Sequence, residues 1–245
     1  MKYTLEICAG SLRSAMAAQQ GGADRVELCD NLSEGGTTPS YGMIKSCKSL
    51  LNIPVFPIIR PRGGDFIYSD YEFEVMKQDI LCCLELGCEG TVFGILHSDG
   101  SIDKERCAEL VRISGKMQLT FHRAFDRCIN RESGLEDIIS MGFHRVLTSG
   151  GMNHAADAIP ELERLVEQAG TRISIMPGSG IIDQNLLQIA RETGAFEFHT
   201  TAKGKIDQKV DNHSQNNRDT RYLFETDVVK VAEMRRILDL VALAL

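Results

Sequence analysis

Several kinds of sequence feature are missing from this chain, and each absence removes a class of protein. No two cysteines have the CxxC spacing of a zinc site, although the sequence holds 8 cysteines. The residues after Lys2 lack the apolar core of about 7 to 15 residues that marks a secretory signal. No uncharged apolar run reaches the roughly 20 residues of a membrane helix. We therefore expect a soluble, cytoplasmic protein whose cysteines are reduced thiols.

An excess of positive charge is also missing. Asp and Glu number 34 against 27 Lys and Arg, which gives a net charge of −7 at pH 7. Proteins that bind nucleic acid or anionic membranes in general rely on a strongly basic surface. The composition therefore predicts no nucleic-acid partner and no membrane partner. Hydrophobic residues make up 43% and charged residues 25% of the 245 residues, and this mixture fits one globular domain over residues 1–245.

One local pattern recurs along the chain: a helical stretch, a glycine, and then a short β-rich run. The glycine suits the left-handed position that ends a helix, and it stands at Gly22, Gly87, Gly142 and Gly194. Further strand-like runs lie between these copies, at residues 3–8, 54–60, 117–122 and 172–176. Helical periodicity covers the intervening segments, at residues 11–20, 40–51, 71–86, 103–114, 132–141, 153–169, 183–192 and 226–243. The alternation predicts an α/β fold, a closed (β/α)8 barrel of the TIM type, with an open doubly wound sheet as the weaker alternative.

The segment 202–225 interrupts the alternation. It is polar, contains the run NHSQNN from Asn212 to Asn217, and shows no convincing period. We expect a loop after the eighth strand, either a lid over the barrel mouth or a mobile insertion.

Carboxylates and thiols end the first two predicted strands. Because side chains alternate along a strand, Glu6 and Cys8 share one face, and Glu27 and Cys29 share another. Carboxyl ends of parallel strands meet at one rim, where α/β folds place their active sites. We expect these four side chains to line one wall of a pocket.

The carboxylates and two histidines are the candidate catalytic residues. Glu6 and Glu27 would be costly inside a barrel unless they were paired or solvated, which favours a functional role over a structural ion pair with an arginine. His122 and His199 each close a strand that points into the mouth, where a histidine can act as a general acid or base. The structural alternative is a histidine that only hydrogen-bonds a neighbouring carboxylate.

The thiols of Cys8 and Cys29 are the candidate metal ligands. Soft thiolates prefer Cu(I) or zinc, and two opposed cysteines can hold Cu(I) in a near-linear site. A free cysteine also behaves as a small buried hydrophobe, so both interpretations stay open at this stage.

Glycine-rich turns and arginines form a candidate anion site. The turn at residues 176–181 follows a strand and precedes a helix, so its backbone N–H groups can approach an anion. Arginine forks suit carboxylate or phosphate. The candidate anion-binding residues are Arg60, Arg62, Arg123, Ser149, Gly178, Ser179 and Gly180. The alternative is that these turns need glycine for backbone geometry alone, and no Walker or dinucleotide signature is present.

Long stretches of the sequence resemble the CutC family. They are GGADRVELCDNLSEGGTTPS, PVFPIIRPRGGDFIYSD, LTFHRAFD, GFHRVLTSGG and the segment from MPGSGI to EFHTTA, and the likeness runs from the first strand to about residue 202. The resemblance implies a cytoplasmic (β/α)8 barrel, a homodimer, with a role in copper homeostasis and copper binding. Carried over by position, the family's candidate copper thiols fall on Cys8 and Cys29. Its polar pocket falls on Glu6, Glu27, Arg60, His122, Arg123, Ser149 and His199.

Two functions therefore compete at the level of sequence, and whether the chain is an enzyme stays open. The first is copper homeostasis through Cu(I) bound by Cys8 and Cys29. The second is a lyase, isomerase or hydrolase that acts on a small phosphorylated or carboxylated molecule by carboxylate and histidine acid–base chemistry. No lysine ends a strand, which disfavours a Schiff-base aldolase, and no organic cofactor is indicated. A binding barrel without chemistry ranks third.

Overall fold

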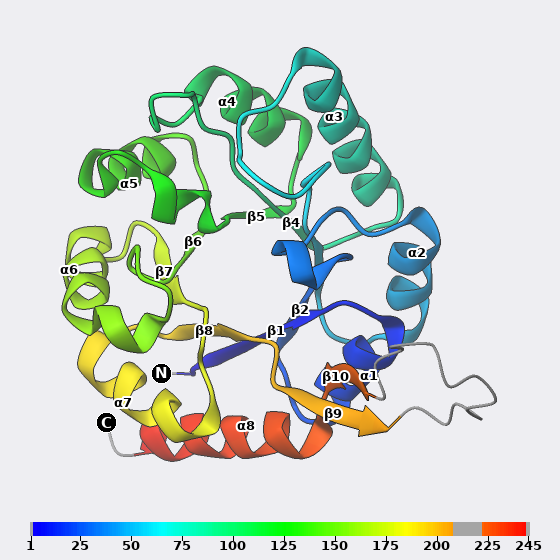
Figure 1. Cartoon of the computed structure of the whole chain (residues 1–245), viewed down its shortest axis with the longest axis vertical. Helices are drawn as coiled ribbons and strands as arrows, with labels where there is room; N and C mark the ends of the chain where they lie inside the picture. Colours follow the sequence, from blue (N-terminus) through cyan, green and yellow to red (C-terminus); the bar gives the residue numbers. More distant parts are fainter. Residues whose placement is uncertain (1, 208–221, 244–245) are drawn as a thin grey trace, which may run out of the picture.

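Parallel strands form a closed barrel that is surrounded by helices (Figure 1). The computed structural model describes residues 2–207 and 222–243. One four-stranded sheet has the order β3-β2-β1-β8 and the other the order β4-β5-β6-β7. The strands are β1 (Thr4–Ala9), β2 (Arg25–Leu28), β3 (Val55–Pro57), β4 (Gly90–Phe93), β5 (Gln118–Phe121), β6 (Arg145–Thr148), β7 (Ser174–Pro177) and β8 (Glu197–Thr200). Parallel bridges from Ile58 to Val92 and from Gly178 to His199 join the two sheets, which confirms the predicted (β/α)8 barrel.

The helices begin close to the residues that the sequence indicates. They are α1 (Leu12–Gln20), α2 (Tyr41–Leu50), α3 (Asp70–Glu85), α4 (Lys104–Ile113), α5 (Arg131–Ser140), α6 (Ile159–Ala169), α7 (Asp183–Thr193) and α8 (Val228–Leu243). Ser69 and Glu72 form a capping box at the start of α3. The helix expected from residue 153 differs, because a 3-10 turn over Ala155–Ala158 comes first and α6 begins at Ile159, with a proline in its first turn. Within the described residues, no helix is both long enough and apolar enough to cross a membrane.

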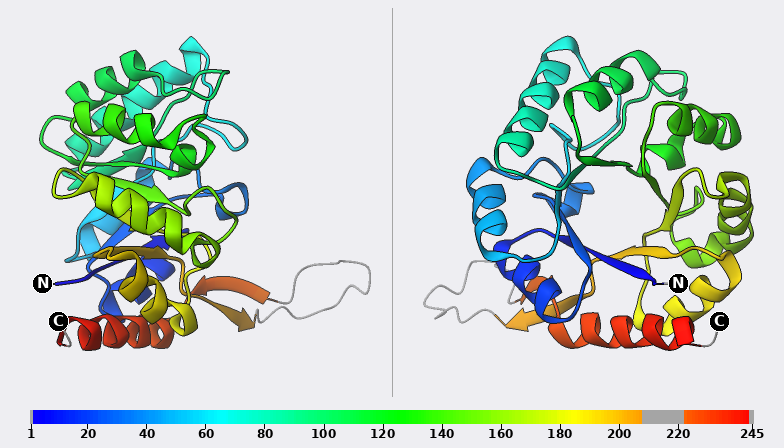
Figure 2. Two further views of the ribbon diagram at one scale, coloured as in Figure 1. Left: turned by 90° about the vertical axis from the view of Figure 1, so that its left-hand side faces the viewer. Right: turned by 180° about the vertical axis from the view of Figure 1, so that it is seen from behind.

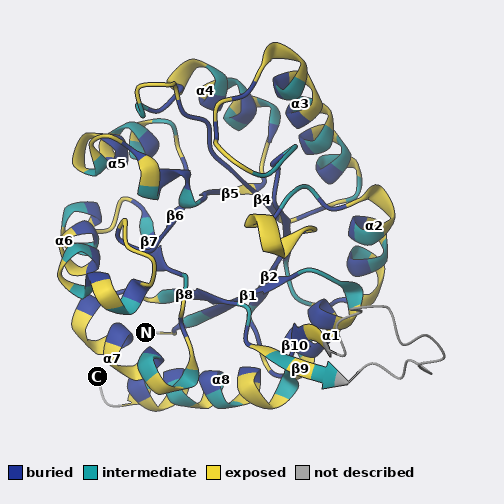
Figure 3. Ribbon diagram, in the orientation of Figure 1, coloured by how far each residue is buried: buried dark blue, intermediate teal, exposed yellow. Residues whose placement is uncertain are grey.

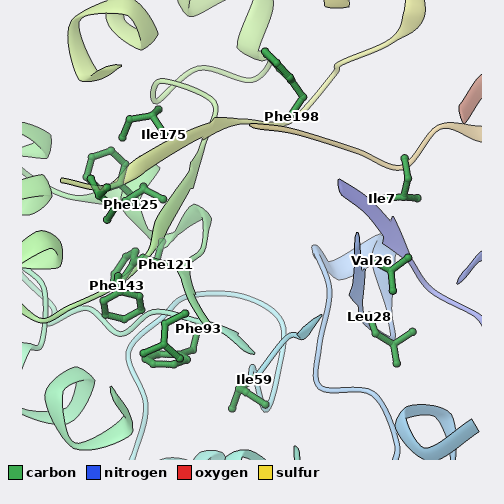
Figure 4. Packing of buried hydrophobic residues seen from close by; sticks show 14 of the residues in the cluster. Ile7, Val26, Leu28, Ile59, Phe93, Phe121, Phe125, Phe143, Ile175 and Phe198 are labelled. Atoms are coloured by element: carbon green, nitrogen blue, oxygen red, sulfur yellow. The ribbon is translucent and has the colours of Figure 1, made fainter. Parts of the chain in front are cut away.

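The apolar core lies between the strands and the helices (Figure 3). Outward-facing strand residues such as Ile7, Val26 and Phe198 are fully buried there. The ring of Phe143 packs at 5.1 Å from that of Phe93 and at 5.4 Å from that of Phe121 (Figure 4). Because strand side chains alternate, the polar residues of the same strands face the barrel interior.

Charged side chains fill the interior of the barrel toward the amino ends of the strands. Arg25 forms ion pairs with Glu6 and Glu197, and Arg145 Nε lies 3.1 Å from Glu197 Oε2. Both guanidinium groups stack on the Phe56 ring at 5.2 Å. These paired charges form a rigid layer beneath the strand ends that the sequence marked as functional.

The segment expected to be a loop contains a pair of strands. Strand β9 (Lys203–Asp207) pairs antiparallel with β10 (Tyr222–Thr226), and the pair leaves from the barrel face opposite the two chain ends (Figure 2). The sequence pattern does not predict β10, because its β-rich run stands alone beside a polar stretch. The expected lid or mobile insertion falls mainly on residues 208–221, which lie outside the described residues.

Candidate functional site

A cavity of about 760 Å³ opens at the carboxyl ends of the barrel strands. This position matches the rim at which the sequence placed the candidate site. The cavity lining includes the predicted residues Cys8, Glu27, Arg60, His122, Arg123, Ser179, Gly180 and His199. The predicted residues that lie behind this lining or away from it are Glu6, Cys29, Arg62, Ser149 and Gly178.

The Cys8 thiol contributes to the cavity lining, and the Cys29 thiol lies next to it outside that lining. Their sulfur atoms are 3.4 Å apart, and both residues are buried against Phe56, Ile58 and Val92. The hydrogen bond with Cys29, burial and the nearby Glu27 carboxylate raise the pKa of the Cys8 thiol well above its usual range. Cys8 is therefore protonated at neutral pH, and a metal ion that binds there must displace the proton.

Behind Cys8, a histidine lies between two carboxylates. Glu6 Oε1 is 2.7 Å from His199 Nδ1, and Glu27 Oε2 is 3.7 Å from His199 Nε2. Burial opposes the ionisation of Glu6, but Arg25 and His199 outweigh it, so the pKa of Glu6 lies well below its usual range. Burial also opposes the charge on His199, but Glu27 and Glu6 outweigh it and raise the pKa of the imidazole.

Glu27 differs from Glu6 because one of its carboxylate oxygens has no hydrogen-bond partner among the described residues. Burial raises the pKa of the Glu27 carboxyl, and only part of that rise is offset by His199. Its Oε1 atom is buried and has no hydrogen-bond partner among the described residues. A buried carboxyl oxygen without a partner at a cavity wall is positioned to accept a hydrogen bond from a ligand.

The His122 imidazole is a neutral hydrogen-bond donor on the cavity wall. Its Nδ1 accepts the Ala124 backbone N–H at 3.3 Å, which places the ring proton on Nε2. Burial, and after it the Arg60 guanidinium, lower the pKa of His122 to about 3. The Nε2 atom is buried and finds no partner in the part of the chain that the structure describes.

The two arginines after β3 have different surroundings. Arg60 donates to the carbonyl oxygens of Glu34, Gly36 and Gly64 at 2.7, 2.8 and 3.0 Å, and thereby holds two rim loops together. Its remaining buried atom, Nε, has no partner within the described residues. Arg62 lies outside the cavity lining and pairs with carboxylates, with Nε at 2.5 Å from Glu72 Oε1.

An aspartate carboxylate accepts hydrogen bonds from the backbone N–H groups that follow β6. Asp126 accepts the N–H groups of Ser149 and Gly151 at 3.0 and 3.1 Å, and also the Ser149 hydroxyl at 2.9 Å. Arg123 pairs with the same carboxylate at 2.8 Å. The residues expected to bind an external anion here are thus already bound to an internal one. Sequence reasoning missed Asp126, although it ends the stretch LTFHRAFD that carries the family resemblance.

The turn after β7 borders the cavity with a strained backbone. Ser179 has a φ of 77°, which is unusual for a residue with a side chain, and Gly180 has a φ of 68°. The Ser179 hydroxyl donates to the Asn153 carbonyl at 2.7 Å, and the His154 ring packs against Gly180. These contacts fix the turn as part of the rim.

Two lysines at the rim were also missed by the sequence reasoning. Lys203 follows β8 and Lys230 lies in the first turn of α8, and both line the cavity. Lys230 Nζ donates to the Lys203 carbonyl at 2.9 Å, which brings the two segments together. No local sequence signal identifies them, because the segment between them has no period that places its ends.

A family comparison agrees with this barrel. A model of the CutC family matches residues 3–204, from β1 to the start of β9. The chain belongs to the CutC family. This CutC chain is 50% identical over 206 residues to a family protein CutC from Chromobacterium violaceum, covering 84% of this chain and 83% of that one. It is 51% identical over 205 residues to the human copper homeostasis protein cutC homolog, covering 84% of this chain and 75% of that one.

Solved structures agree with the CutC assignment. A crystal structure of CutC from Streptococcus agalactiae superposes with a TM-score of 0.78 at 39% identity, covering 81% of this chain and 98% of that one. A thiamine phosphate pyrophosphorylase from Pyrococcus furiosus superposes with a TM-score of 0.60 at 14% identity, over 98% of this chain and 96% of that one, which shows a shared fold alone.

Proposed function

We propose that this CutC protein takes part in copper homeostasis by binding one Cu(I) ion between Cys8 and Cys29. The observation that carries this proposal is the 3.4 Å approach of the two sulfur atoms, of which the Cys8 residue lines an open cavity. The names of the relatives, among them the human copper homeostasis protein cutC homolog, support the same role. The copper ion is here the cargo of the protein.

The donor set fits a soft metal ion. Thiolate–metal bonds of about 2.3 Å place two opposed sulfurs about 4.6 Å apart, so the thiols separate by about 1 Å when they bind. His199 offers an imidazole beside Cys8, since ligand atoms of Cys8, Glu27 and His199 lie within 4.8 Å of one another. Imidazole suits copper, whereas the Glu27 carboxylate is a hard donor that favours other ions.

The test is the Cu(I) affinity of the reduced protein, measured under anaerobic conditions by competition with a chelator. Cys8→Ser and Cys29→Ser should each lower the affinity at least about 100-fold, because each removes one of two thiolate ligands. Cys107→Ser is the matched control, since Cys107 is equally buried but lies on α4. Unchanged affinity in both cavity variants would rule out the thiol pair as the copper site.

A second candidate function follows from the size of the cavity and from two buried atoms. A volume of about 760 Å³ far exceeds one metal ion, and Glu27 Oε1 and His122 Nε2 have no partner within the described residues. We propose that the same cavity binds a small phosphorylated or carboxylated molecule and acts on it by acid–base chemistry. Glu27 would accept a proton, and the neutral His122 would donate a hydrogen bond to a substrate oxygen.

The rim supplies the charge for the anionic end of such a molecule. Lys203 and Lys230 line the cavity, as does Arg123, whose charge is already paired with Asp126, whereas the floor carries Glu27. This separation favours a binding mode with the phosphate or carboxylate at the mouth and the reacting carbon atoms near the floor. The Glu6 carboxylate behind His199 keeps the imidazole oriented toward Glu27.

Calorimetric titration with glycerol 3-phosphate and with glycerol tests this second candidate. The phosphorylated probe should bind at least about tenfold more tightly, and Lys230→Ala should remove about tenfold of that affinity, because it deletes a charge-assisted contact. Lys104→Ala is the control, since Lys104 lies on the outer surface and pairs with Asp137. Equal affinity for both probes would remove the rim as an anion site.

A further inference from the structure

A second pair of thiols lies at the opposite face of the barrel, where α3 ends. Cys83 is in the last turn of α3, and Cys88 follows the end of the helix and precedes β4. The Cys88 N–H donates to the Cys83 carbonyl at 2.9 Å, and the Gly87 N–H donates to the Leu84 carbonyl at 3.0 Å. Gly87 has a φ of 71°. This double hydrogen bond with a left-handed glycine is a Schellman motif, which characteristically packs the side chains of its first and last residues together.

The same helix ending recurs elsewhere in the barrel with apolar side chains at the two positions. After α1, Ala23 N–H donates to the Ala18 carbonyl at 3.0 Å, and after α5, Phe143 N–H donates to the Ile138 carbonyl at 3.4 Å. After α3, the corresponding positions are both cysteines. The barrel thus places two thiols where its other helix endings place an apolar contact.

The backbone hydrogen bond limits the distance between the two cysteines. The N···O distance of 2.9 Å and standard bond lengths put the Cα atoms of Cys83 and Cys88 at most about 7 Å apart. Disulfides join Cα atoms about 4.4–6.8 Å apart. The two side chains are also close enough that each shifts the pKa of the other thiol.

The two thiols differ in their surroundings. The hydrogen bond to Cys88 and burial raise the pKa of the Cys83 thiol, and the same bond, with the Lys48 ammonium nearby, lowers the pKa of Cys88. Cys83 is fully buried, whereas 6% of Cys88 is exposed. Cys88 is therefore the more exposed residue of the pair, and its lowered pKa favours the thiolate that reacts first with a small oxidant.

We propose that Cys83 and Cys88 are a redox modification site that forms a reversible disulfide with a hydroperoxide as oxidant. The Cys88 thiolate attacks the peroxide oxygen, the O–O bond breaks, and Cys88 becomes a sulfenic acid as water leaves. The Cys83 sulfur then attacks the Cys88 sulfur, the S–O bond breaks, and a second water leaves. Two thiols are oxidised and one hydrogen peroxide is reduced to two waters. This site is separate from the copper proposal, because it lies at the amino ends of the strands.

The experiment uses the reduced full-length protein, hydrogen peroxide and alkylation of the remaining thiols. Cleavage after Glu85 separates Cys83 from Cys88 in sequence, so mass spectrometry detects their disulfide as two peptides that remain joined until a reductant is added. We expect this joined product in the wild-type protein and in Cys82→Ser, the control at the neighbouring position. Cys83→Ser should instead accumulate sulfenic acid on Cys88, which a dimedone label detects, and Cys88→Ser should form neither product. Peroxide treatment that leaves Cys83 and Cys88 unjoined, or that joins Cys82 to Cys88, would overturn the proposal.

Discussion

The two thiol pairs of this CutC protein contain the same functional group in opposite settings. Cys8 lies in β1 and Cys29 directly follows β2, and the Cys8 thiol lies near the Glu27 carboxylate and the His199 imidazole. Cys83 and Cys88 come from one helix ending. Cys8 and Cys29, called the mouth pair below, therefore combine soft donors with a cavity that Cys8 lines, which suits a metal ion. In the pair Cys83 and Cys88, one thiol has a raised pKa and the other a lowered pKa, which suits disulfide exchange.

The largest expected effect is that each of two double variants loses one property, either Cu(I) binding or disulfide formation, and keeps the other. Cys8→Ser with Cys29→Ser should abolish tight Cu(I) binding and leave the peroxide-driven disulfide at residues 83 and 88 intact. Cys83→Ser with Cys88→Ser should do the reverse. Chelator competition and peptide mapping on the same preparations measure both properties. If either double variant lost both properties, the two pairs would not be independent sites.

The next effect concerns the layer of charges that lies only under the mouth pair. Arg25→Met leaves Glu6 and Glu197 buried without their shared cation, so it should lower the free energy of unfolding by about 3–5 kcal/mol. Arg172→Met is the control, because Arg172 pairs with Glu136 at the surface and should contribute less than about 1 kcal/mol. Urea unfolding of the three proteins measures the difference. A loss equal to that of the control would show that the buried layer does not brace the mouth.

A smaller effect is the pH dependence that His122, on the cavity wall, gives to the free energy of unfolding. The pKa of His122 is about 3 in the folded protein against 6.5 for a free histidine, so the unfolded chain takes up a proton first as pH falls. The stability contributed by the neutral ring is complete above pH 6.5 and is lost as pH falls toward 3. Between pH 7 and pH 5, the wild-type protein should lose about 2 kcal/mol more than His122→Asn. Urea unfolding at the two pH values tests this, and parallel losses in both proteins would contradict it.

The smallest effect belongs to the pair after α3. A Cβ at Gly87 would meet no atom within 4 Å, so Gly87→Ala tests only the positive φ of that residue. We expect a loss of about 1 kcal/mol in unfolding free energy and slower disulfide formation, because the Schellman motif is strained. Gly42→Ala, inside α2, should instead stabilise the protein slightly. Unchanged disulfide formation in Gly87→Ala would separate the reactivity of the thiols from the helix ending.

Periodicity was enough to predict the barrel, because each strand and helix carries its own local signal. The glycines after four of the helices and the alternation along the strands indicated the rim at which the cavity opens, although Glu6 and Cys29 are not part of its lining. The pairing of Asp126 with the backbone of Ser149 was not predictable, since it depends on the distance between two neighbouring strand ends. Lys203 and Lys230 were missed for a related reason, because their approach depends on how the chain returns to the barrel after β10.

The contact between Glu225 and the start of α1 limits how early the barrel can close during synthesis of the chain. The Glu225 carboxylate accepts the hydroxyl groups of Ser11 and Ser14, and β1 pairs with β8 at the same seam. On the ribosome, Ser11 is released 214 residues before Glu225, so an emerging chain exposes β1 as an open sheet edge until β8 and Glu225 have been synthesised. Closure of the seam therefore cannot precede the synthesis of Glu225, and a chaperone that shielded β1 until then would protect an open sheet edge.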